Sequence, residues 1–598
     1  MDRRIVTGNT PVGPFSCSGA TIGSVQPSRD VTVDARSVRP SRVRDLGGTD
    51  AGLLGLCLVV GVATGLGAIA FRLLIEGLTW AFTGTSDYAA TPGAAHGWLP
   101  GVGRWFVVLT PVLAGLLYGP LVHLGAPEAR GHGVPEVMYA VARRGGRIPP
   151  RVAVVKSLAS ALCIGGGGSV GREGPIVQVG SALGSSIGRL VRAAEDRQRL
   201  LVACGAAGGI AATFNAPMAG VVFAMEIVLR DFAARSFGMV VVSSVTASVV
   251  GRAVLGDEPF LDLPGFRVEH LVTYGLFVLL GLLAGVTGVV FVRVLYGVED
   301  VCDRLWRGPE WLRPAVGGLA LGLLLAVPEM YGVGYPVLGE GVAGSYAVGT
   351  LLFLLVAKMV ATSLTIGIGG SGGVFAPSLF AGAMLGAAFG QTAVAVSPAA
   401  SGAAGAFALV GMAAVFAGAA RAPITAVLIV FELTGEYSLI LPLMLAVALA
   451  TGISSLLSRT TIYTAKLVRR GVDLDAPPPS WAARHPVRVV MAPARGRCGR
   501  ARRCPRPPMR CAPHRAVSCR SRTPGAGCSA CWRPRRWPSG WARSPTTPIP
   551  RSGPRSGRPC RRRPASPRRW SCWSSTRCTP CRWSRTVGSS AGSPPPPS

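Results

Sequence analysis

The sequence has few charged residues for its length, and its excess of basic charge lies almost entirely in one segment. Charged side chains make up 15% of the 598 residues, against roughly 25% in an average soluble domain. The formal net charge is +33, but residues 481–598 hold 27 Arg and no Lys, Asp or Glu, which leaves 34 basic and 28 acidic residues in the first 480. This composition argues against a soluble multidomain enzyme, and it does not indicate a nucleic-acid partner for the first 480 residues.

The cysteine spacing matches no disulfide or zinc framework. Ten of the 15 Cys fall in residues 481–598 at irregular intervals, and the other five are scattered. We therefore expect no metal site and no cofactor, and we do not expect an enzyme. Residues 1–50 are polar and lack the short apolar core of a cleavable secretory signal, so we expect a polar cytoplasmic N-terminal segment.

Long apolar stretches recur between residues 51 and 470, separated by short connectors rich in glycine, proline and charge. Clear examples, each close to the ~20 residues that span a bilayer, are 51–70, 105–122, 236–255, 271–292, 350–368 and 438–457. Other stretches are too short or too interrupted by glycine to span alone, and in a membrane such broken helices line a cavity or face other protein. The pattern predicts an all-α polytopic membrane protein.

The membrane region contains an internal repeat. The repeated pairs are 167–184 with 369–386, at an offset of 202, and 205–226 with 411–432, at an offset of 206. We expect two related halves at about 51–255 and 270–467. Repeated halves with discontinuous helices are typical of transporters, which hold their substrate near the midplane where the halves meet.

The C-terminal segment 493–598 has a composition that does not support a folded domain. From residue 481 onward the chain contains no Leu or Phe but 21 Pro, ten Cys and seven Trp, so it cannot bury enough apolar surface to fold alone. One interpretation is that this segment is translated in the wrong reading frame of a GC-rich gene. In favour of it, residues 485–493 (HPVRVVMAP) resemble the start of a normal domain, whereas the residues directly after them do not. The alternative is a natural basic disordered tail, which would make the protein a membrane-tethered nucleic-acid binder.

Four loops that contain glycine or proline lead directly into apolar segments. They are 131–137 (GHGVPEV), 168–180 (GSVGREGPIVQVG), 211–220 (AATFNAPMAG) and 367–380 (GIGGSGGVFAPSLF). Proline near a first helical turn, with glycine before it, marks a helix N-terminus. Such an end presents unpaired N–H groups and about half a positive charge, so several of them together can replace the water around an anion. We therefore predict a small anion as the substrate.

Between about residues 51 and 470 the sequence resembles the CLC family of chloride channels and proton-coupled anion exchangers. The resemblance rests on GREGP at 171–175, GGVFAP at 372–377, Gly-x-Gly-x-Pro at 131–135 and a Tyr in the last apolar segment. It implies a homodimer in which each subunit has its own pore, built from tilted helices in two inverted-topology halves. It also implies a multi-pass protein of the bacterial plasma membrane, with 471–492 as a linker and the vestige of a CBS-type regulatory domain.

Glu173 is the most informative single residue, since a carboxylate in an apolar, glycine-rich membrane segment is costly and usually functional. The resemblance implies that Glu173 is a gate, which occupies an anion site when ionised and swings away when protonated. The alternative is a structural ion pair with Arg172 or Lys156. The resemblance also implies that Lys156 raises the positive potential for anions, while Arg172 would give electrostatic support beside the gate.

The anion-binding residues implied by the resemblance come from three loops. Val374 and Phe375 would contribute backbone N–H groups, and the Tyr463 hydroxyl would contact the central anion and close the inner side of its path. His132 stands where better-known members carry Ser. It would contact the anion itself, or it would turn aside into a loop hydrogen bond while the amide of Gly131 or Gly133 faces the ion. The sequence therefore does not exclude nitrate or fluoride as the transported anion.

Ile227 replaces a Glu that often relays protons in exchangers of the family, and an isoleucine cannot carry a proton. This departure slightly favours a channel or a loosely coupled transporter, with a chloride/proton antiporter as the alternative. The preceding residue, Glu226, has a repeat mate in Glu432, which favours a shared structural role at helix ends. Basic residues expected on the cytoplasmic side are Arg143, Arg144, Arg147, Arg151, Lys466, Arg469 and Arg470.

Overall fold

The computed structural model describes residues 49–474, except 92, 99–100, 102, 104, 257–270 and 397–403. All of them belong to the first of the two units into which the chain divides, residues 1–478 and 479–598. The expectations for residues 1–48 and for the linker and tail beyond residue 474 concern positions outside the described residues, and they stay predictions.

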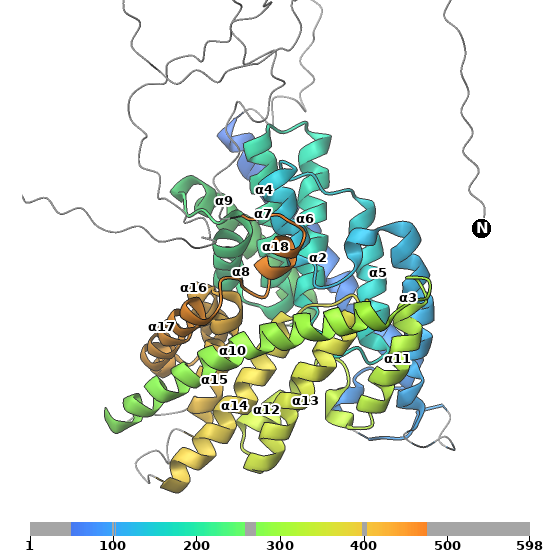
Figure 1. Ribbon diagram of the computed structural model, residues 1–598. Coiled ribbons are helices and arrows are strands. Elements are labelled where there is room, and N and C mark those ends of the chain that lie inside the picture. Colours follow the sequence, from blue (N-terminus) through green and yellow to red (C-terminus); the bar gives the residue numbers. More distant parts are fainter. Residues whose placement is uncertain are drawn as a thin grey trace, which may run out of the picture. The chain divides into compact units, whose positions relative to one another are not determined.

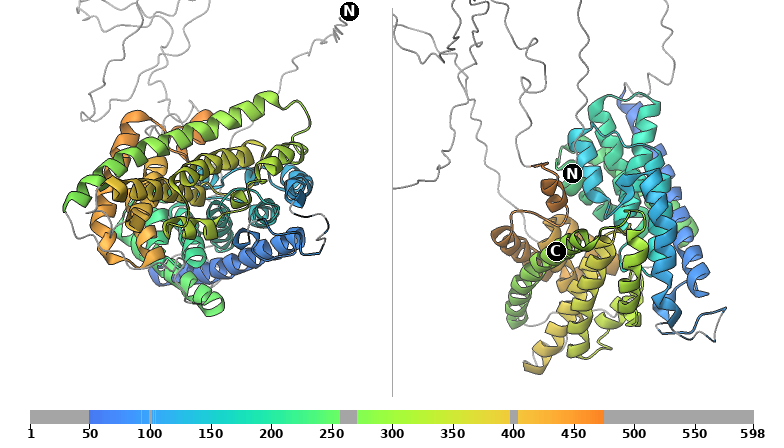
Figure 2. Two further views of the ribbon diagram at one scale, coloured as in Figure 1. Left: turned by 90° about the horizontal axis from the view of Figure 1, so that it is seen from below. Right: turned by 45° about the vertical axis from the view of Figure 1, so that its right-hand side comes forward.

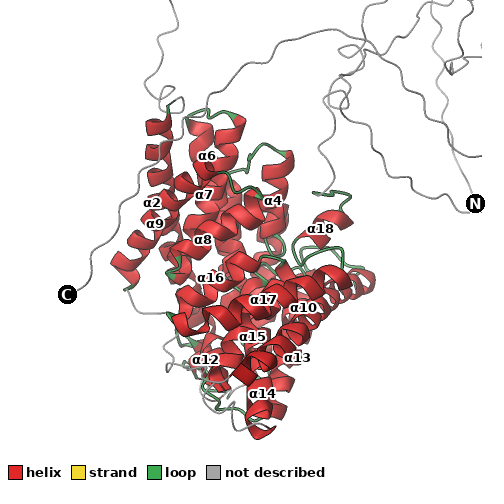
Figure 3. Ribbon diagram, turned by 90° about the vertical axis from the view of Figure 1, so that its left-hand side faces the viewer, coloured by secondary structure: helices red, strands yellow, loops and turns green. Residues whose placement is uncertain are grey.

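The described residues form helices and no β-strand (Figure 3). The first half contains α2 (Asp50–Thr83), α3 (Thr110–Gly125), α4 (Val134–Arg143), α5 (Arg151–Gly165), α6 (Glu173–Leu190), α7 (Glu195–Phe214), α8 (Pro217–Phe223) and α9 (Ala234–Leu255). The second half contains α10 (Leu271–Leu305), α11 (Arg313–Leu324), α12 (Tyr335–Val342), α13 (Val348–Gly367), α14 (Phe375–Val396), α15 (Ala404–Ala420), α16 (Pro423–Thr434) and α17 (Ile440–Leu457), followed by α18 (Thr464–Arg469). The single turns η1 (Tyr88–Ala90), η3 (Trp105–Val108), η4 (Pro127–Ala129), η6 (Pro328–Met330) and η8 (Tyr437–Leu439) and the π-helical turn η5 (Ala224–Leu229) connect them. The predicted all-α class is confirmed.

Seven helical segments among the described residues are long and apolar enough to cross a membrane. They are Asp50–Thr83, Trp105–Gly125, Ala234–Leu255, Thr273–Leu305, Val348–Gly367, Phe375–Val396 and Tyr437–Leu457. The six stretches expected from the sequence correspond to six of these spans. The 34 residues of α2 and the 35 of α10 extend for about 50 Å, more than the ~30 Å hydrocarbon core, so these helices are tilted or protrude. Figure 2 (left) shows α10 along one margin of the helices and α2 along the opposite one.

The two halves repeat the same helix order and run in opposite directions. Gly171 and Gly373, which the 202-residue offset relates, donate backbone hydrogen bonds to each other at 2.8 and 2.6 Å. They pair in antiparallel fashion. From this pair α6 extends toward one end of the structure and α14 toward the other (Figures 1 and 3). A local two-fold axis therefore passes between Gly171 and Gly373, as the inverted-topology expectation requires.

Glycine permits the close helix packing within each half. A Cβ added at Gly180 of α6 would lie 2.2 Å from the carbonyl oxygen of Gly205 in α7. The corresponding pair in the second half is Gly382 of α14 and Gly411 of α15, where the same distance is 2.4 Å. Any larger residue would separate these helices, because the backbone itself occupies the space.

The halves are tied together by Glu226 and Glu432. The Glu226 carboxylate accepts hydrogen bonds from the backbone N–H groups of Ile424 (3.3 Å) and Thr425 (2.9 Å) at the start of α16, and from the Thr425 hydroxyl. The Glu432 carboxylate accepts from the N–H groups of Met218 and Ala219 at the start of α8, at 2.9 and 2.6 Å. Each half thus supplies the cap of a helix in the other half, which is the helix-end role expected for this pair.

Candidate functional site

The N-termini of α4, α6 and α14 converge on one buried pocket. Residues from these ends, together with two aromatic residues from α8 and the segment before α18, form its wall, which consists of His132, Val134, Glu173, Gly174, Phe223, Val374, Phe375 and Tyr463. The pocket is too narrow in this conformation to admit a water molecule. Three helix N-termini around one small space make an environment that favours negative charge.

The loop geometry that aims these helices depends on glycine. Gly133 adopts a φ of +80°, and a Cβ there would lie 2.8 Å from the carbonyl oxygen of Gly174. Proline follows within the first turn of α4 and α6, at Pro135 and Pro175, where its missing N–H is not needed. Gly133 packs against α6 and is not part of the pocket wall. The structure therefore gives it a packing role, and the anion contact expected for it stays a prediction.

The Glu173 side chain lies in the wall of this buried pocket, next to the first turn of α14. It is 2% exposed, and its Oε2 lies 3.4 Å from the backbone nitrogen of Ala376 in the first turn of α14. Its Oε1 accepts a hydrogen bond from the hydroxyl of Tyr335 at 2.5 Å. A Cβ on Gly171 would lie 1.9 Å from Oε2, so glycine at this position makes room for the carboxylate. The structure contains no ion pair between Glu173 and Lys156 within the described residues.

His132 and Tyr463 each bring a buried polar atom without a protein partner to the pocket. Nδ1 of His132 and the hydroxyl of Tyr463 make no hydrogen bond to any described residue. The side chains are 1% and 2% exposed, and their ring centroids lie 6.4 Å apart. A buried polar atom left unpaired costs about 1–3 kcal/mol, so two of them beside one pocket indicate a ligand that accepts or donates hydrogen bonds.

Val374 and Phe375 lie where α14 begins and complete the wall on that side. The Phe375 ring packs on Phe416 with centroids 4.5 Å apart, which holds the first turn of α14 in place. The Phe375 side chain is thereby used in packing, and the Val374 side chain is buried. The expected role of these two residues through backbone N–H groups stays a prediction.

Lys156 is not part of the pocket wall but contacts the loop that leads into α4. The side chain is fully buried, and Nζ donates to the carbonyl oxygens of Ala129 (2.9 Å) and Gly131 (2.7 Å). Its repeat mate Lys358 donates in the same way to the carbonyl oxygen of Gly332 at 2.9 Å. Both lysines therefore hold the loop that precedes α4 or α12, a structural role that the sequence interpretation did not include.

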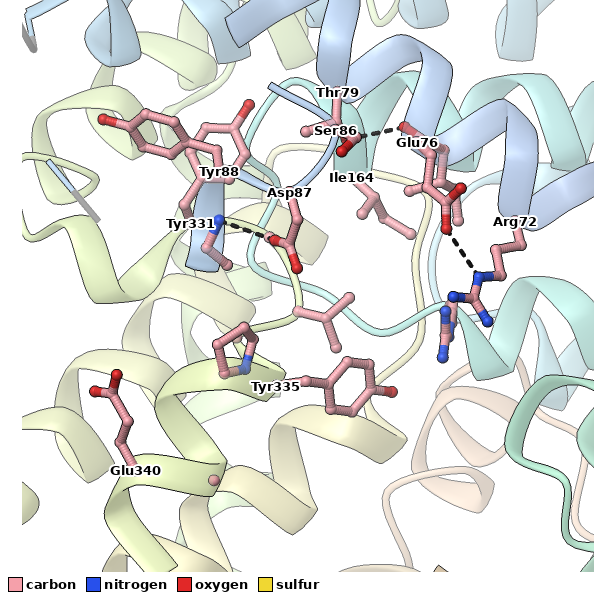
Figure 4. Close-up of a pocket in the computed structure, with 18 of the residues that line it drawn as sticks. Arg72, Glu76, Thr79, Ser86, Asp87, Tyr88, Ile164, Tyr331, Tyr335 and Glu340 are labelled. Atoms are coloured by element: carbon pink, nitrogen blue, oxygen red, sulfur yellow. Dashed lines mark hydrogen bonds and ion pairs between the residues drawn. The ribbon is translucent and has the colours of Figure 1, made fainter. Parts of the chain in front are cut away.

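A second, open pocket lies next to Glu173 and Arg172, with a volume of about 780 Å³. Its lining includes Tyr335 from the start of α12 and Arg72 and Glu76 from α2 (Figure 4). Arg172 also lines it. The Arg172 guanidinium lies over the Tyr335 ring at 5.3 Å from the centroid. The Tyr335 phenol therefore lies between this open pocket and the Glu173 carboxylate. Arg172 adds a positive charge to the lining of the open pocket.

Ile227 lies in η5, in the apolar core, and is 5% exposed. No titratable atom occupies this position, as the sequence already indicated. The same turn contains Glu226, whose carboxylate is used to cap α16. Among the described residues, no group of three or more His, Cys, Asp or Glu side chains is arranged to hold a metal ion.

The two basic segments expected on one side of the membrane lie at the same end of the structure. Arg470 forms an ion pair with Glu136 of α4 at 2.6 Å, and an amino group of Arg143 lies 3.3 Å from the carbonyl oxygen of Asp473. Tyr463 lines the buried pocket and directly precedes this basic C-terminal segment in the sequence, at the end that the positive-inside tendency predicts to be cytoplasmic.

Two functional candidates were missed in the sequence, Tyr335 and Tyr296. Residues 332–338 (GVGYPVL) repeat the Gly-x-Gly-x-Pro pattern of 131–137 at an offset of 201, which would have pointed to Tyr335. Tyr296 lies on α10, and its hydroxyl contacts Nε2 of His132 at 3.4 Å and the carbonyl oxygen of Ile462 at 2.7 Å. No motif surrounds Tyr296, so only the fold brings it to the site.

Residues 114–455 match the model of the family described as voltage gated chloride channel. A relative from Ralstonia nicotianae, named as a ClcB-like chloride channel protein, is 35% identical over 437 residues, which cover 72% of this chain and 99% of the relative. A protein of Vibrio parahaemolyticus named H(+)/Cl(-) exchange transporter ClcA is 38% identical over 375 residues, or 61% of this chain and 79% of that protein.

Solved structures show the same architecture. The crystal structure of a slow cyanobacterial Cl-/H+ antiporter superposes with a TM-score of 0.63 at 27% sequence identity, over 70% of this chain and 97% of that one. The overall helical architecture is thus shared with a protein described as a Cl-/H+ antiporter.

Proposed function

The chain belongs to the voltage gated chloride channel (CLC) family, and from that premise we propose that it exchanges chloride for protons across a membrane. It is a multi-pass integral membrane protein with at least seven apolar spans among its described residues. Its family and its anion-favouring pocket support transport of a small inorganic anion. The named relatives are bacterial, so we place the protein in a bacterial plasma membrane and, by the family resemblance, in a homodimer.

One observation carries the proposal, namely that the Glu173 carboxylate lies against the α14 N-terminus, at the Ala376 amide. Two unit negative charges ~4 Å apart repel each other by about 4 kcal/mol at an effective dielectric constant near 20. An ionised Glu173 and a chloride ion therefore exclude each other from this pocket. Adding a proton to Glu173 removes the repulsion, which makes anion entry depend on proton binding.

The relatives favour exchange over the channel interpretation that Ile227 suggested. The ClcA proteins of several Vibrio species, 36–39% identical to this chain, are named exchange transporters, and the cyanobacterial structure is described as an antiporter. We therefore propose the antiporter, which the sequence had ranked second, as the main function. The absence of an acid at Ile227 is compatible with it if protons reach Glu173 by another route.

A channel remains the second candidate, because two observations favour it. The buried Ile227 offers no proton-carrying group, and the ClcB-like relative is named a chloride channel protein. Both candidates require Glu173 to leave the pocket before chloride passes.

The reversal potential in reconstituted liposomes separates the two. With a fixed chloride gradient, an exchanger's reversal potential moves when a pH gradient is added, whereas a channel's potential follows the chloride gradient alone. Glu173→Ala serves as the control, since it should abolish any displacement by protons while chloride still passes. A wild-type potential that ignores the pH gradient would refute exchange.

A further inference from the structure

The contact between His132 and Tyr296 determines which imidazole nitrogen carries the proton. The Tyr296 hydroxyl lies 2.7 Å from the carbonyl oxygen of Ile462 and 3.4 Å from Nε2 of His132. A carbonyl oxygen only accepts, so the single phenolic proton is donated to Ile462 and the phenolic oxygen is left as an acceptor. Nε2 of His132 therefore carries a hydrogen and donates it to Tyr296.

This arrangement leaves Nδ1 of neutral His132 as a lone pair. Nδ1 is buried, makes no hydrogen bond to any described residue, and belongs to a residue of the pocket wall. A lone pair repels an anion, whereas the protonated imidazole has an N–H at both nitrogens. Neutral His132 therefore cannot bind chloride through Nδ1, and protonated His132 can.

We propose that chloride enters this pocket together with a proton bound at Nδ1 of His132, which makes His132 a second proton-binding group of the site beside Glu173. The proton comes from the adjoining solution, forms the Nδ1–H bond, and returns to water when chloride leaves, so no other group is consumed. The proposal rests on the chloride transport proposed above, and it concerns a proton that is bound and released with chloride, separate from the proton that is exchanged through Glu173. It also gives the pocket wall a titratable group, whereas Ile227 has none.

Several titratable groups face His132 from the surrounding elements, and they oppose or favour the added proton. These groups are Lys156, Glu173, Tyr296, Tyr463, Lys466 and Arg470. Burial opposes a proton on the imidazole most strongly and so lowers the pKa of His132, and the three cations add to this effect. A chloride ion bound beside the imidazole favours the proton and acts against both. Ionised Glu173 also favours the proton, so its contribution must be removed before that of His132 can be measured.

Calorimetric titration of chloride into the purified full chain carrying Glu173→Gln isolates the effect of His132. Titrations in two buffers of different ionisation enthalpy give the number of protons taken up for each chloride bound. At pH values at which His132 is neutral in the absence of chloride, we expect the uptake to approach one proton per chloride bound. In this pH range the chloride affinity should fall about tenfold for each unit by which the pH rises. Chloride binding with no proton uptake and an affinity independent of pH would overturn the proposal.

His132→Asn, added to Glu173→Gln, tests whether His132 is the group that takes the proton. The amide keeps a neutral N–H donor near the position of Nδ1, so we expect chloride binding to survive with an affinity that varies less than about twofold over the same pH range. His96→Asn is the matched control, since His96 is also buried but accepts from the backbone of Trp98, and it should keep the parent's proton uptake. Uptake that survives His132→Asn would assign the proton to another group, such as Lys156 or Lys466, and overturn the proposal.

Tyr296→Phe provides a second test that does not depend on the folding of the His132 variant. Without the phenolic oxygen, Nε2 loses its acceptor, and the neutral imidazole is free to carry its proton on Nδ1 and donate to chloride. We expect the pH dependence of chloride affinity to flatten, and an unchanged tenfold slope would contradict the fixed tautomer. Failure of the proposed exchange is distinguishable, because proton-linked chloride binding with a reversal potential that ignores pH would leave this proposal standing.

Discussion

The hydroxyl of Tyr335 donates a hydrogen bond to Oε1 of Glu173 at 2.5 Å, so a residue that begins α12 in one half holds the carboxylate that begins α6 in the other. The phenol contacts this carboxylate from the side of the open pocket that also contains Arg172. If Glu173 is the gate, as we propose, a path toward that pocket opens only when this hydrogen bond breaks.

Tyr335→Phe should release Glu173 from this contact and ease its protonation. A hydrogen bond to a charged group contributes about 1.5–3 kcal/mol, and 1.36 kcal/mol corresponds to one pH unit, so the pH of half-maximal chloride flux should rise by about one unit or more. Flux from proteoliposomes, measured across pH, checks this. Tyr346→Phe is the matched control, because it removes a phenol-to-carboxylate hydrogen bond, to Glu340, away from Glu173. An unchanged profile in Tyr335→Phe would show that the hydrogen bond does not restrain the gate.

Tyr463→Phe should weaken chloride binding and at the same time stabilise the anion-free protein. The hydroxyl has no hydrogen-bond partner among the described residues. Without chloride, its removal therefore eliminates the cost of a buried, unpaired polar atom. With chloride bound, its removal deletes a hydrogen-bond donor to the anion. We expect the chloride dissociation constant to rise about three- to tenfold, as the loss of a net ~1 kcal/mol hydrogen bond predicts. The melting temperature in chloride-free buffer should not fall.

Tyr296→Phe is the stability control for that experiment, since its hydroxyl bonds to the carbonyl oxygen of Ile462 and its loss should lower the melting temperature. A drop in stability of Tyr463→Phe without chloride, or an unchanged chloride affinity, would contradict the assignment of Tyr463 to the anion.

Glu226→Ala and Glu432→Ala should each destabilise the membrane domain by uncapping a helix of the opposite half. Each carboxylate accepts at least two backbone hydrogen bonds, and the loss of a helix cap costs about 0.5–2 kcal/mol. Thermal unfolding in detergent should show a lower melting temperature for both, with Gln substitutions intermediate. Glu436→Ala, which removes an exposed contact with the Ser438 hydroxyl, should have little effect. If Glu226→Ala keeps full stability but loses proton coupling, the residue acts in proton transfer and not as a cap.

Much of the fold could be predicted because its signals are local or periodic. The apolar stretches gave six of the seven spans, and the 202-residue offset predicted two halves. The same offset relates Gly171 to Gly373, whose pairing marks the axis between the halves. The clustering of His132, Glu173, Phe375 and Tyr463 was implied by the family resemblance, and the structure brings these residues to one pocket.

The remaining features depend on contacts between segments that are distant in sequence. Tyr296 reaches His132 across 164 positions, and its place on α10 has no local pattern. The sequence predicts that Lys156 acts on the anion by its charge, whereas its hydrogen bonds to two carbonyl oxygens show that it also holds a loop. The choice of a channel over an exchanger rested on Ile227 alone, and one missing carboxylate does not show which other groups, such as His132, are available to protons.

The central claim is that the Glu173 carboxylate and the transported anion compete for the same place at the start of α14. Crystals of the full chain soaked in bromide, an anomalous scatterer that replaces chloride, test it directly when wild-type protein and Glu173→Ala are compared at the same neutral pH. We predict a bromide peak within hydrogen-bonding distance of the Ala376 backbone nitrogen in Glu173→Ala and none there in the wild type. Equal bromide occupancy at this position in both proteins, or no peak in either, would contradict the account.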